Sequence, residues 1–191
     1  MGATGVTGGD VKVRLATILV VGVVVFGTMM IPTASGQAAR VRGLPDCTIT
    51  GTRGDDRLRG TAERDVICAL AGDDFVNGRG GNDLILLGPG EDGFNGGGGN
   101  DQVRGGSGPD FGTGGPGDDN LFAQKGNDLI ISDTVGSDLI SGGDGDDSCL
   151  SAFDGADDDS VLGGNGTDTF NADAGDSTST VENGPTPCEG G

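Results

Sequence analysis

Thirteen aspartates recur at nearly constant spacing through the middle of the chain, and they are the residues best suited to do chemistry. The first nine follow one another at intervals of nine residues, and two later intervals lengthen to ten and twelve. A carboxylate is a hard anionic ligand that suits a hard cation such as Ca²⁺. The series therefore predicts repeated calcium sites at Asp56, Asp65, Asp74, Asp83, Asp92, Asp101, Asp110, Asp119, Asp128, Asp138, Asp147, Asp159 and Asp168.

Each aspartate is position 6 of a nonapeptide with the pattern G-G-x-G-x-D-x-U-x, where U is a large apolar residue. Residues 96–104, for example, read GGGGNDQVR. The glycines allow the first six residues to turn sharply, and the last three form a short strand whose middle side chain alone points inward. Position 8 is apolar in all repeats but two, which have Gly112 and Cys149. The apolar residues are Leu58, Ile67, Val76, Ile85, Phe94, Val103, Leu121, Ile130, Ile140, Val161 and Phe170.

Strands this short must stack on neighbouring turns in a parallel ladder. Two nonapeptides make one turn of eighteen residues, which predicts about six and a half turns and a stack about 31 Å long. Gly112 leaves a gap in the core that a neighbouring ring, Phe111 or Phe94, would fill. Extra residues near Ser132 to Val135 and near Ser151 to Phe153 are expected to bulge as loops outside the strands.

The nonapeptide closely resembles the RTX family, the hemolysin-type calcium-binding repeats of secreted bacterial proteins. The resemblance covers residues 51–171. It implies an all-β fold, a parallel β-roll (a β-solenoid), with calcium shared by aspartates of stacked loops. Asp56 would share an ion with Asp74, and Asp65 with Asp83 on the other side, giving about eleven possible ions. Glu63 and Asp157 replace the position-4 glycine, where a side chain would crowd the turn or add a ligand.

The composition makes folding without metal unfavourable. The chain has 42 glycines, seven Phe, no Trp or Tyr, and a net charge of −19. Glycine raises the entropy lost on folding, and the charge repels itself in a compact state. Residues 1–39 hold one acid and two bases, so the rest carries −20, which about eleven divalent ions, roughly +22, would nearly cancel. The same composition is typical of a disordered acidic tail, the state expected without calcium.

The amino terminus predicts export. Lys12 and Arg14 precede an apolar run over residues 15–31 and then small residues, which is typical of a secretory signal peptide in residues 1–38. A membrane anchor is the alternative, although the run is short for spanning a bilayer. We expect a secreted, extracellular protein with no stable membrane insertion after cleavage. An amino-terminal cap (39–50), the β-roll (51–171) and a carboxyl-terminal cap or tail (172–191) would follow.

Export also allows the four cysteines to form disulfides. Cys47 and Cys68 flank the start of the repeats, and Cys149 and Cys188 flank their end. Four cysteines allow three connectivities. We favour the two local pairs, because each would close one open end of the stack.

The sequence favours a binding protein and not an enzyme. It has no histidine, which excludes Ser-His-Asp triads and His-zinc sites, and its acidity argues against nucleic acid. A structural or adhesive extracellular role with a cell-surface partner is one expectation. A calcium-stabilised polysaccharide-binding module, similar to those attached to glycan-processing enzymes, is the alternative. The outward residues that could serve either role form no obvious stripe in the sequence: Arg57, Arg59, Phe75, Phe111 and Phe122.

Overall fold

The computed structural model describes residues 45–132, 135–152, 158–172 and 176–179. All of them lie within one compact unit, Gln37–Gly191. No helix among the described residues is long and apolar enough to cross a membrane. The predicted signal peptide and the first half of the amino-terminal cap lie outside the described residues.

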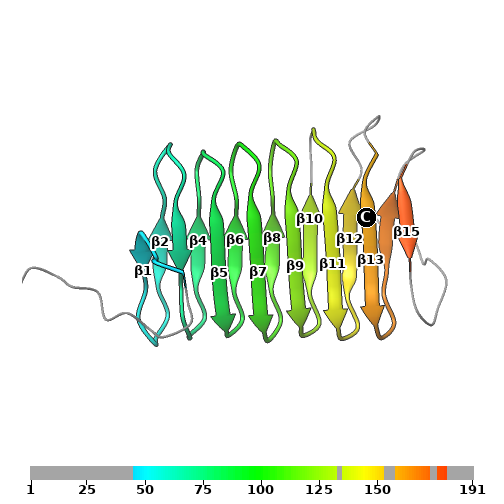
Figure 1. Cartoon of the computed structure of the whole chain (residues 1–191). Coiled ribbons are helices and arrows are strands. Elements are labelled where there is room, and N and C mark those ends of the chain that lie inside the picture. Colours follow the sequence, from blue (N-terminus) through cyan, green and yellow to red (C-terminus); the bar gives the residue numbers. More distant parts are fainter. Residues whose placement is uncertain (1–44, 133–134, 153–157, 173–175, 180–191) are drawn as a thin grey trace, which may run out of the picture. The chain divides into compact units, whose positions relative to one another are not determined.

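The described chain forms two parallel sheets, and successive strands alternate between them (Figure 1). The eight-stranded sheet contains β1 (Ile49–Thr50), β3 (Val66–Cys68), β5 (Leu84–Pro89), β7 (Gln102–Ser107), β9 (Asn120–Lys125), β11 (Leu139–Asp144), β13 (Ser160–Asn165) and β15 (Ser177–Ser179). The seven-stranded sheet contains β2 (Arg57–Arg59), β4 (Phe75–Asn77), β6 (Gly93–Asn95), β8 (Phe111–Thr113), β10 (Leu129–Ser132), β12 (Ser148–Ala152) and β14 (Phe170–Ala172).

The register confirms the eighteen-residue turn. Ile67 pairs with Ile85, and Ile85 pairs with Val103, each one turn further along the same sheet. Every pairing between strands is parallel, because the chain visits the other sheet before it returns. The predicted all-β parallel β-roll is therefore confirmed.

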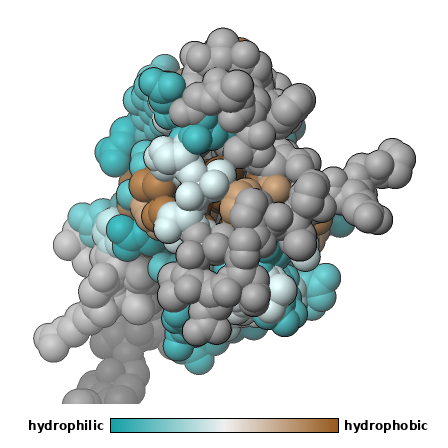
Figure 2. All heavy atoms as spheres, turned by 90° about the vertical axis from the view of Figure 1, so that its right-hand side faces the viewer, coloured by the Kyte–Doolittle hydropathy of each residue, from teal (hydrophilic) through white to brown (hydrophobic). Residues whose placement is uncertain are grey.

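The core is a narrow row of side chains between the sheets, built from position 8. Ile67, Val76 and Ile85 are fully buried there. Phe94 fills the gap at Gly112, because a Cβ on Gly112 would lie 2.7 Å from the Phe94 ring. Phe111 points outward instead and is 46% exposed. Figure 2 faces the β15 end, and hydrophobic residues lie near its middle while hydrophilic ones lie towards the loops above and below.

Position 1 also points into the core at several turns of the eight-stranded sheet, so the prediction of a single inward side chain per strand is wrong there. Strands such as β5 and β9 continue for six residues, into the loop. Since side chains alternate along a strand, the residue two places after position 8 faces the same way. Ala69, Leu87 and Ala123 accordingly join the buried cluster.

One inserted residue lies inside a strand, contrary to expectation. The register between β10 and β12 shifts by one residue, from Leu129 opposite Ser148 to Ile131 opposite Ser151. Leu150 is fully buried and pairs with Phe170 in the core row. A β-bulge absorbs an extra residue and so preserves the inward face. The remaining insertions fall at or beside residues 133–134 and 153–157, outside the described part.

The disulfide predicted at the amino-terminal end is confirmed. Cys47 and Cys68 are bonded, with their Cα atoms 6.0 Å apart. The bond joins the segment just before β1 to strand β3. Strands β1 and β3 also pair directly. Cys188, the proposed partner of Cys149, lies outside the described residues.

Candidate metal centre

The position-6 aspartates form two ladders, one along each edge where the chain passes between sheets. The backbone N–H of each aspartate donates to Oδ1 of the aspartate one turn later, as from Asp101 to Asp119 at 2.7 Å. The bonds continue across the insertions, as from Asp119 to Asp138 at 2.7 Å. The first edge, which leads into the seven-stranded sheet, contains Asp56, Asp74, Asp92, Asp110, Asp128, Asp147 and Asp168. The second edge contains Asp65, Asp83, Asp101, Asp119, Asp138 and Asp159.

The second carboxylate oxygen of most of these aspartates is buried without a hydrogen-bond donor. Asp101 is 1% exposed, and its Oδ2 has no partner. A buried polar atom left unpaired costs about 1–3 kcal/mol, and more when it is charged. Such a series calls for a cation or a proton at each loop. The same description applies to Asp74, Asp83, Asp92, Asp110, Asp119, Asp128, Asp147 and Asp168.

Glycine at position 1 allows this oxygen to approach the backbone closely. A Cβ on Gly96 would lie 2.5 Å from Oδ2 of Asp101 and 2.6 Å from the carbonyl oxygen of Gly114, one turn later. Two oxygens from adjacent turns therefore lie so close to this glycine that a side chain would displace one of them.

Backbone carbonyl oxygens line the same loops. Every residue with positive φ in the described chain occupies position 2 or position 4. A Cβ on Gly90, at position 4, would overlap the carbonyl oxygen of Gly72 and lie 3.1 Å from Oδ1 of Asp92. Position-4 carbonyl oxygens thus stack in a row beside the carboxylates.

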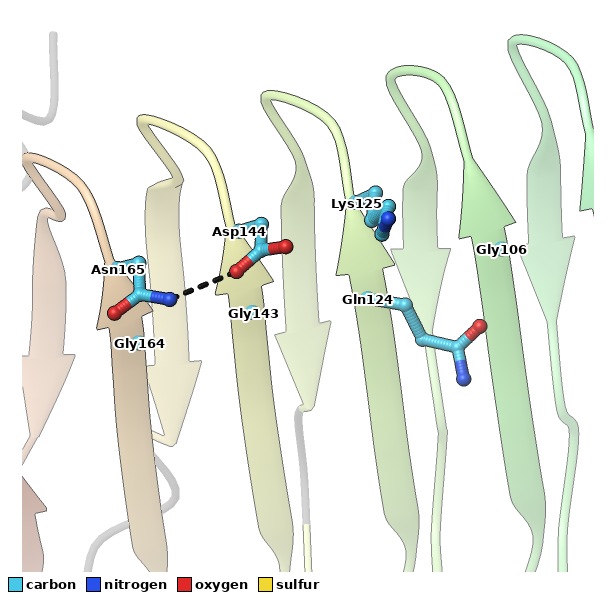
Figure 3. Close-up of a pocket in the computed structure, with 7 residues that line it drawn as sticks. All are labelled: Gly106, Gln124, Lys125, Gly143, Asp144, Gly164 and Asn165. Atoms are coloured by element: carbon cyan, nitrogen blue, oxygen red, sulfur yellow. Dashed lines mark hydrogen bonds between the residues drawn. The ribbon is translucent and has the colours of Figure 1, made fainter.

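Position 2 shows the same stacking, and Figure 3 shows it where the strands of the eight-stranded sheet lead into the loops of the first edge. Gly106, Gln124, Gly143 and Gly164 occupy this position in successive turns and line a shallow pocket. Gln124 keeps positive φ (84°) although it carries a side chain, a conformation that costs about 1–3 kcal/mol. The loop therefore imposes positive φ at position 2 even where the residue there is not glycine and disfavours that conformation.

The donor set fits calcium. The described residues contain no group of three or more His, Cys, Asp or Glu that could hold an ion by themselves. Two aspartates from stacked loops would need backbone carbonyl oxygens to complete a shell. Ca²⁺ takes six to eight oxygen ligands, and carboxylates with backbone carbonyls are among its usual ones. Zinc prefers nitrogen and sulfur, which these loops do not offer.

Burial shifts the acidity of these aspartates in the metal-free protein. Desolvation raises the pKa of Asp92 and Asp101 to about 6, of Asp119 and Asp147 to about 7, and of Asp110 to about 8. Repulsion from neighbouring aspartates of the same ladder adds to the rise. Without metal at neutral pH, the carboxyl of Asp110 is therefore mostly protonated, those of Asp119 and Asp147 are about half protonated, and those of Asp92 and Asp101 are mostly ionised.

The loops of Asp56 and Asp65 differ from the later ones. Their position-2 residues, Thr52 and Thr61, are not in the left-handed region. Each threonine instead donates hydrogen bonds to the aspartate of its own loop. The backbone N–H of Thr61 is the main cause that lowers the pKa of Asp65. Glu63 at position 4 avoids positive φ as well, which explains how a side chain is tolerated there. Asp157 lies outside the described residues.

The sequence reasoning missed one member of the second ladder, Asp176. The N–H of Asp159 donates to Oδ1 of Asp176 at 3.2 Å, and β15 follows directly. Asp176 comes seventeen residues after Asp159, and Thr178 occupies the inward position opposite Val161. A search that allowed one deleted residue and a polar residue at position 8 would have found it.

The outward residues do form a stripe, contrary to the expectation from the sequence. We call it the outer row: Arg57, Phe75, Gly93, Phe111 and Leu129, which pair in register across the seven-stranded sheet. A Cβ on Gly93 would lie 2.9 Å from both phenyl rings, so the two rings flank the glycine. The Arg57 guanidinium lies 5.9 Å from the centre of the Phe75 ring. The row is not apparent in the sequence, because its two phenylalanines lie two turns of the roll apart along the chain. Phe122 belongs to the other sheet.

Comparison with known families identifies the repeat. The RTX calcium-binding nonapeptide repeat (four copies) matches residues 50–85, 69–103, 78–112, 104–135, 113–148, 130–154 and 151–178. None of the curated proteins matches the chain significantly. The matched segments span about two-thirds of the chain and coincide with the strands and aspartate ladders. The chain therefore belongs to the RTX family of hemolysin-type calcium-binding repeat proteins.

Proposed function

We propose that this chain is a secreted calcium-binding protein whose repeat loops bind several Ca²⁺ ions and fold on binding, in a structural or adhesive role outside the cell. The observation that carries the proposal is the series of buried Oδ2 atoms without a donor. Family membership supports calcium as the ion, and the apolar run after Lys12 and Arg14 supports export.

Two kinds of oxygen from the chain would bind each ion. Position-6 carboxylates supply negative oxygens, with Oδ1 already fixed by the N–H of the previous turn. Carbonyl oxygens at positions 2 and 4 supply neutral ones. The bound ion supplies the positive charge that lets stacked carboxylates approach one another. Because each ion would join two turns, binding and stacking form one equilibrium.

A pair of neighbouring substitutions tests the assignment. Asp119 is buried with an unpaired Oδ2, whereas Asp118 is exposed and its carboxylate accepts bonds from neighbouring turns. Asp119→Asn and Asp118→Asn remove the same charge. We expect calorimetric titration to show at least one ion fewer for Asp119→Asn and an unchanged number for Asp118→Asn. Equal ion numbers in both variants and the parent would contradict the assignment.

Coupled folding has its own test. Circular dichroism in a chelator is expected to show little structure, and millimolar calcium is expected to restore a β spectrum. Identical spectra in the two conditions would reject the coupling.

A second candidate function is the polysaccharide-binding module, which the outer row favours. Phe75 and Phe111 present two partly exposed rings on one face, with Arg57 beside them. Sugar rings stack on aromatic faces, and planar Arg can bind an acidic group. A glycan array with the calcium-loaded chain tests this function. Phe111→Ser should abolish any signal, and Leu162→Ser, at a similarly exposed position on the other sheet, should not.

A further inference from the structure

Two threonines saturate the aspartates that begin the ladders. In the first loop, the backbone N–H and the hydroxyl of Thr52 donate to Oδ2 of Asp56 at 2.6 and 2.9 Å. In the second loop, Thr61 donates in the same way to Oδ2 of Asp65, at 2.7 and 2.9 Å. The next loops on each edge, those of Asp74 and Asp83, leave this oxygen unpaired and buried, as do most of the later ones.

The carboxylate of Asp65 has a further donor. The Thr48 hydroxyl donates to Oδ1 of Asp65 at 3.0 Å, where later aspartates receive a backbone N–H from the turn before. The Thr48 hydroxyl thus takes the place of that backbone N–H. Asp65 accepts three hydrogen bonds, all from threonines, and is only 5% exposed.

The backbone of these loops also lacks the conformation that aligns carbonyl oxygens. Positions 2 and 4 of both loops lie outside the left-handed region, although position 4 of the first loop is a glycine, Gly54. The Thr52 hydroxyl accepts the Gly54 N–H at 3.2 Å, and the Thr61 hydroxyl accepts the Glu63 N–H at 3.1 Å. Each threonine closes its loop with its own side chain, a local turn that needs no ion.

We propose that Thr52 and Thr61 take the place of calcium in the first two loops. Asp56 and Asp65 are then structural residues of an ion-independent cap, and calcium binding begins with Asp74 and Asp83. The inference rests on the proposed calcium function of the later loops. If each ion joins two ligating loops, the number of sites falls by two, from about eleven to about nine among the thirteen aspartates.

The cap would give the calcium-driven stack a folded edge to grow from. In a solenoid, each turn is stabilised mainly by its neighbours, so the first turn has the fewest contacts to hold it. Here the threonine bonds and the Cys47–Cys68 disulfide hold that turn.

Two aspartates of the second edge, one turn apart, separate the possibilities. We expect the full chain with Asp65→Asn to bind as many Ca²⁺ ions as the parent, and Asp83→Asn to bind at least one fewer. An equal loss in both variants would overturn the cap. If neither variant loses an ion, the calcium assignment of the later loops fails, a different result from failure of the cap alone.

A gain of binding provides the second test. Thr61→Gly combined with Glu63→Gly gives the second loop the glycines of the family pattern and removes the hydroxyl. We expect this variant to bind one additional Ca²⁺ by calorimetry, while Thr61→Ser, which keeps a hydroxyl, binds the parental number. No gain in the double variant would show that threonine does not exclude the ion.

Discussion

At the scale of single residues, the two oxygens of each ladder carboxylate have different roles. Oδ1 accepts the N–H of the preceding turn and fixes the rotamer, as between Asp92 and Asp110 at 3.1 Å. Oδ2 is thereby held beside the loop backbone without a hydrogen-bond donor and remains available to a cation. A ligand that is already positioned loses little entropy on binding, so the ladder prepares the sites.

Two adjacent glycines test how strongly the loop depends on positive φ. Gly99, at position 4, has φ +114°, and a Cβ there would overlap the Gly81 carbonyl oxygen, whereas one on Gly98 would meet nothing within 4 Å. We expect Gly99→Ala to destabilise the calcium-loaded protein by about 2 kcal/mol or more, and Gly98→Ala to change it by less than about 0.5 kcal/mol. Thermal melting at saturating calcium measures both. Similar melting temperatures for the two variants would contradict the loop geometry.

Gln124 offers the opposite change. Its positive φ stores strain that glycine would release, at the cost of a more flexible unfolded chain. We expect Gln124→Gly to stabilise the loaded protein by up to about 1 kcal/mol. Gln102→Gly, within β7, serves as the control and should destabilise it by about 0.5–1 kcal/mol. Denaturant unfolding in calcium compares the two, and a destabilised Gln124→Gly would show that its side chain has a role of its own.

At the scale of the strands, stability depends on one core residue per short strand. β6 and β8 have three residues each, and Phe94 fills the core for both because Gly112 lies opposite it. We expect Phe94→Ala to cost about 3–5 kcal/mol, since two strands lose their only large core side chain. Phe111→Ala, on the outer face of the same sheet, should cost less than about 1 kcal/mol. Chemical denaturation in calcium measures both, and equal losses would mean that the ring of Phe94 is not the filler.

The sequence predicted the strands well because a fixed phase determines both the inward face and the partner one turn away. Ile67, Ile85 and Val103 illustrate this, since burial and register follow from spacing alone. It did not predict the bulge before Leu150, because a one-residue shift leaves no local signal when Cys149 and Leu150 are both apolar. Nor did it show that Thr61 takes the place of the cation beside Asp65, because that depends on hydroxyl geometry within the loop.

At the metal site, too, the sequence predicted positions but not hydrogen-bond partners. Spacing identified the thirteen ladder aspartates but treated them as equivalent. Asp65 and Asp101 share a sequence pattern at position 6, yet one accepts threonine hydrogen bonds and the other has an unpaired oxygen. Periodicity therefore predicts where a carboxylate lies, while its function depends on the neighbours that the fold supplies.

At the scale of the whole β-roll, burial and charge oppose each other. Burying one large apolar side chain per nine residues stabilises the fold by far less free energy than the entropy cost of ordering the backbone of those residues. The same folding that buries this core also buries twelve aspartates. The balance can favour the folded state only when these carboxylates, apart from the threonine-bonded Asp65, are neutralised, either by metal or by protons.

Acid should therefore replace calcium in part. In the metal-free protein, burial raises the pKa of Asp101 to about 6, of Asp119 to about 7 and of Asp110 to about 8. An unfolded aspartate titrates near 4, so between about pH 4 and pH 8 the folded protein binds more protons than the unfolded chain. This contribution to stability is complete below about pH 4 and is lost as the pH rises through 6 to 8. Asp65, whose pKa is lowered, opposes the trend at one site only.

We accordingly expect calcium-free protein to be more stable at pH 4.5, where it shows a melting transition, than at pH 8, where it is largely unfolded. The loaded protein should show the reverse order, because calcium requires ionised carboxylates and protons compete with it. Melting curves at both pH values, with and without millimolar calcium, provide the four measurements. If the calcium-free protein is more stable at pH 8, the ladder carboxylates are not buried together without metal, and the loops must rearrange when the ion leaves.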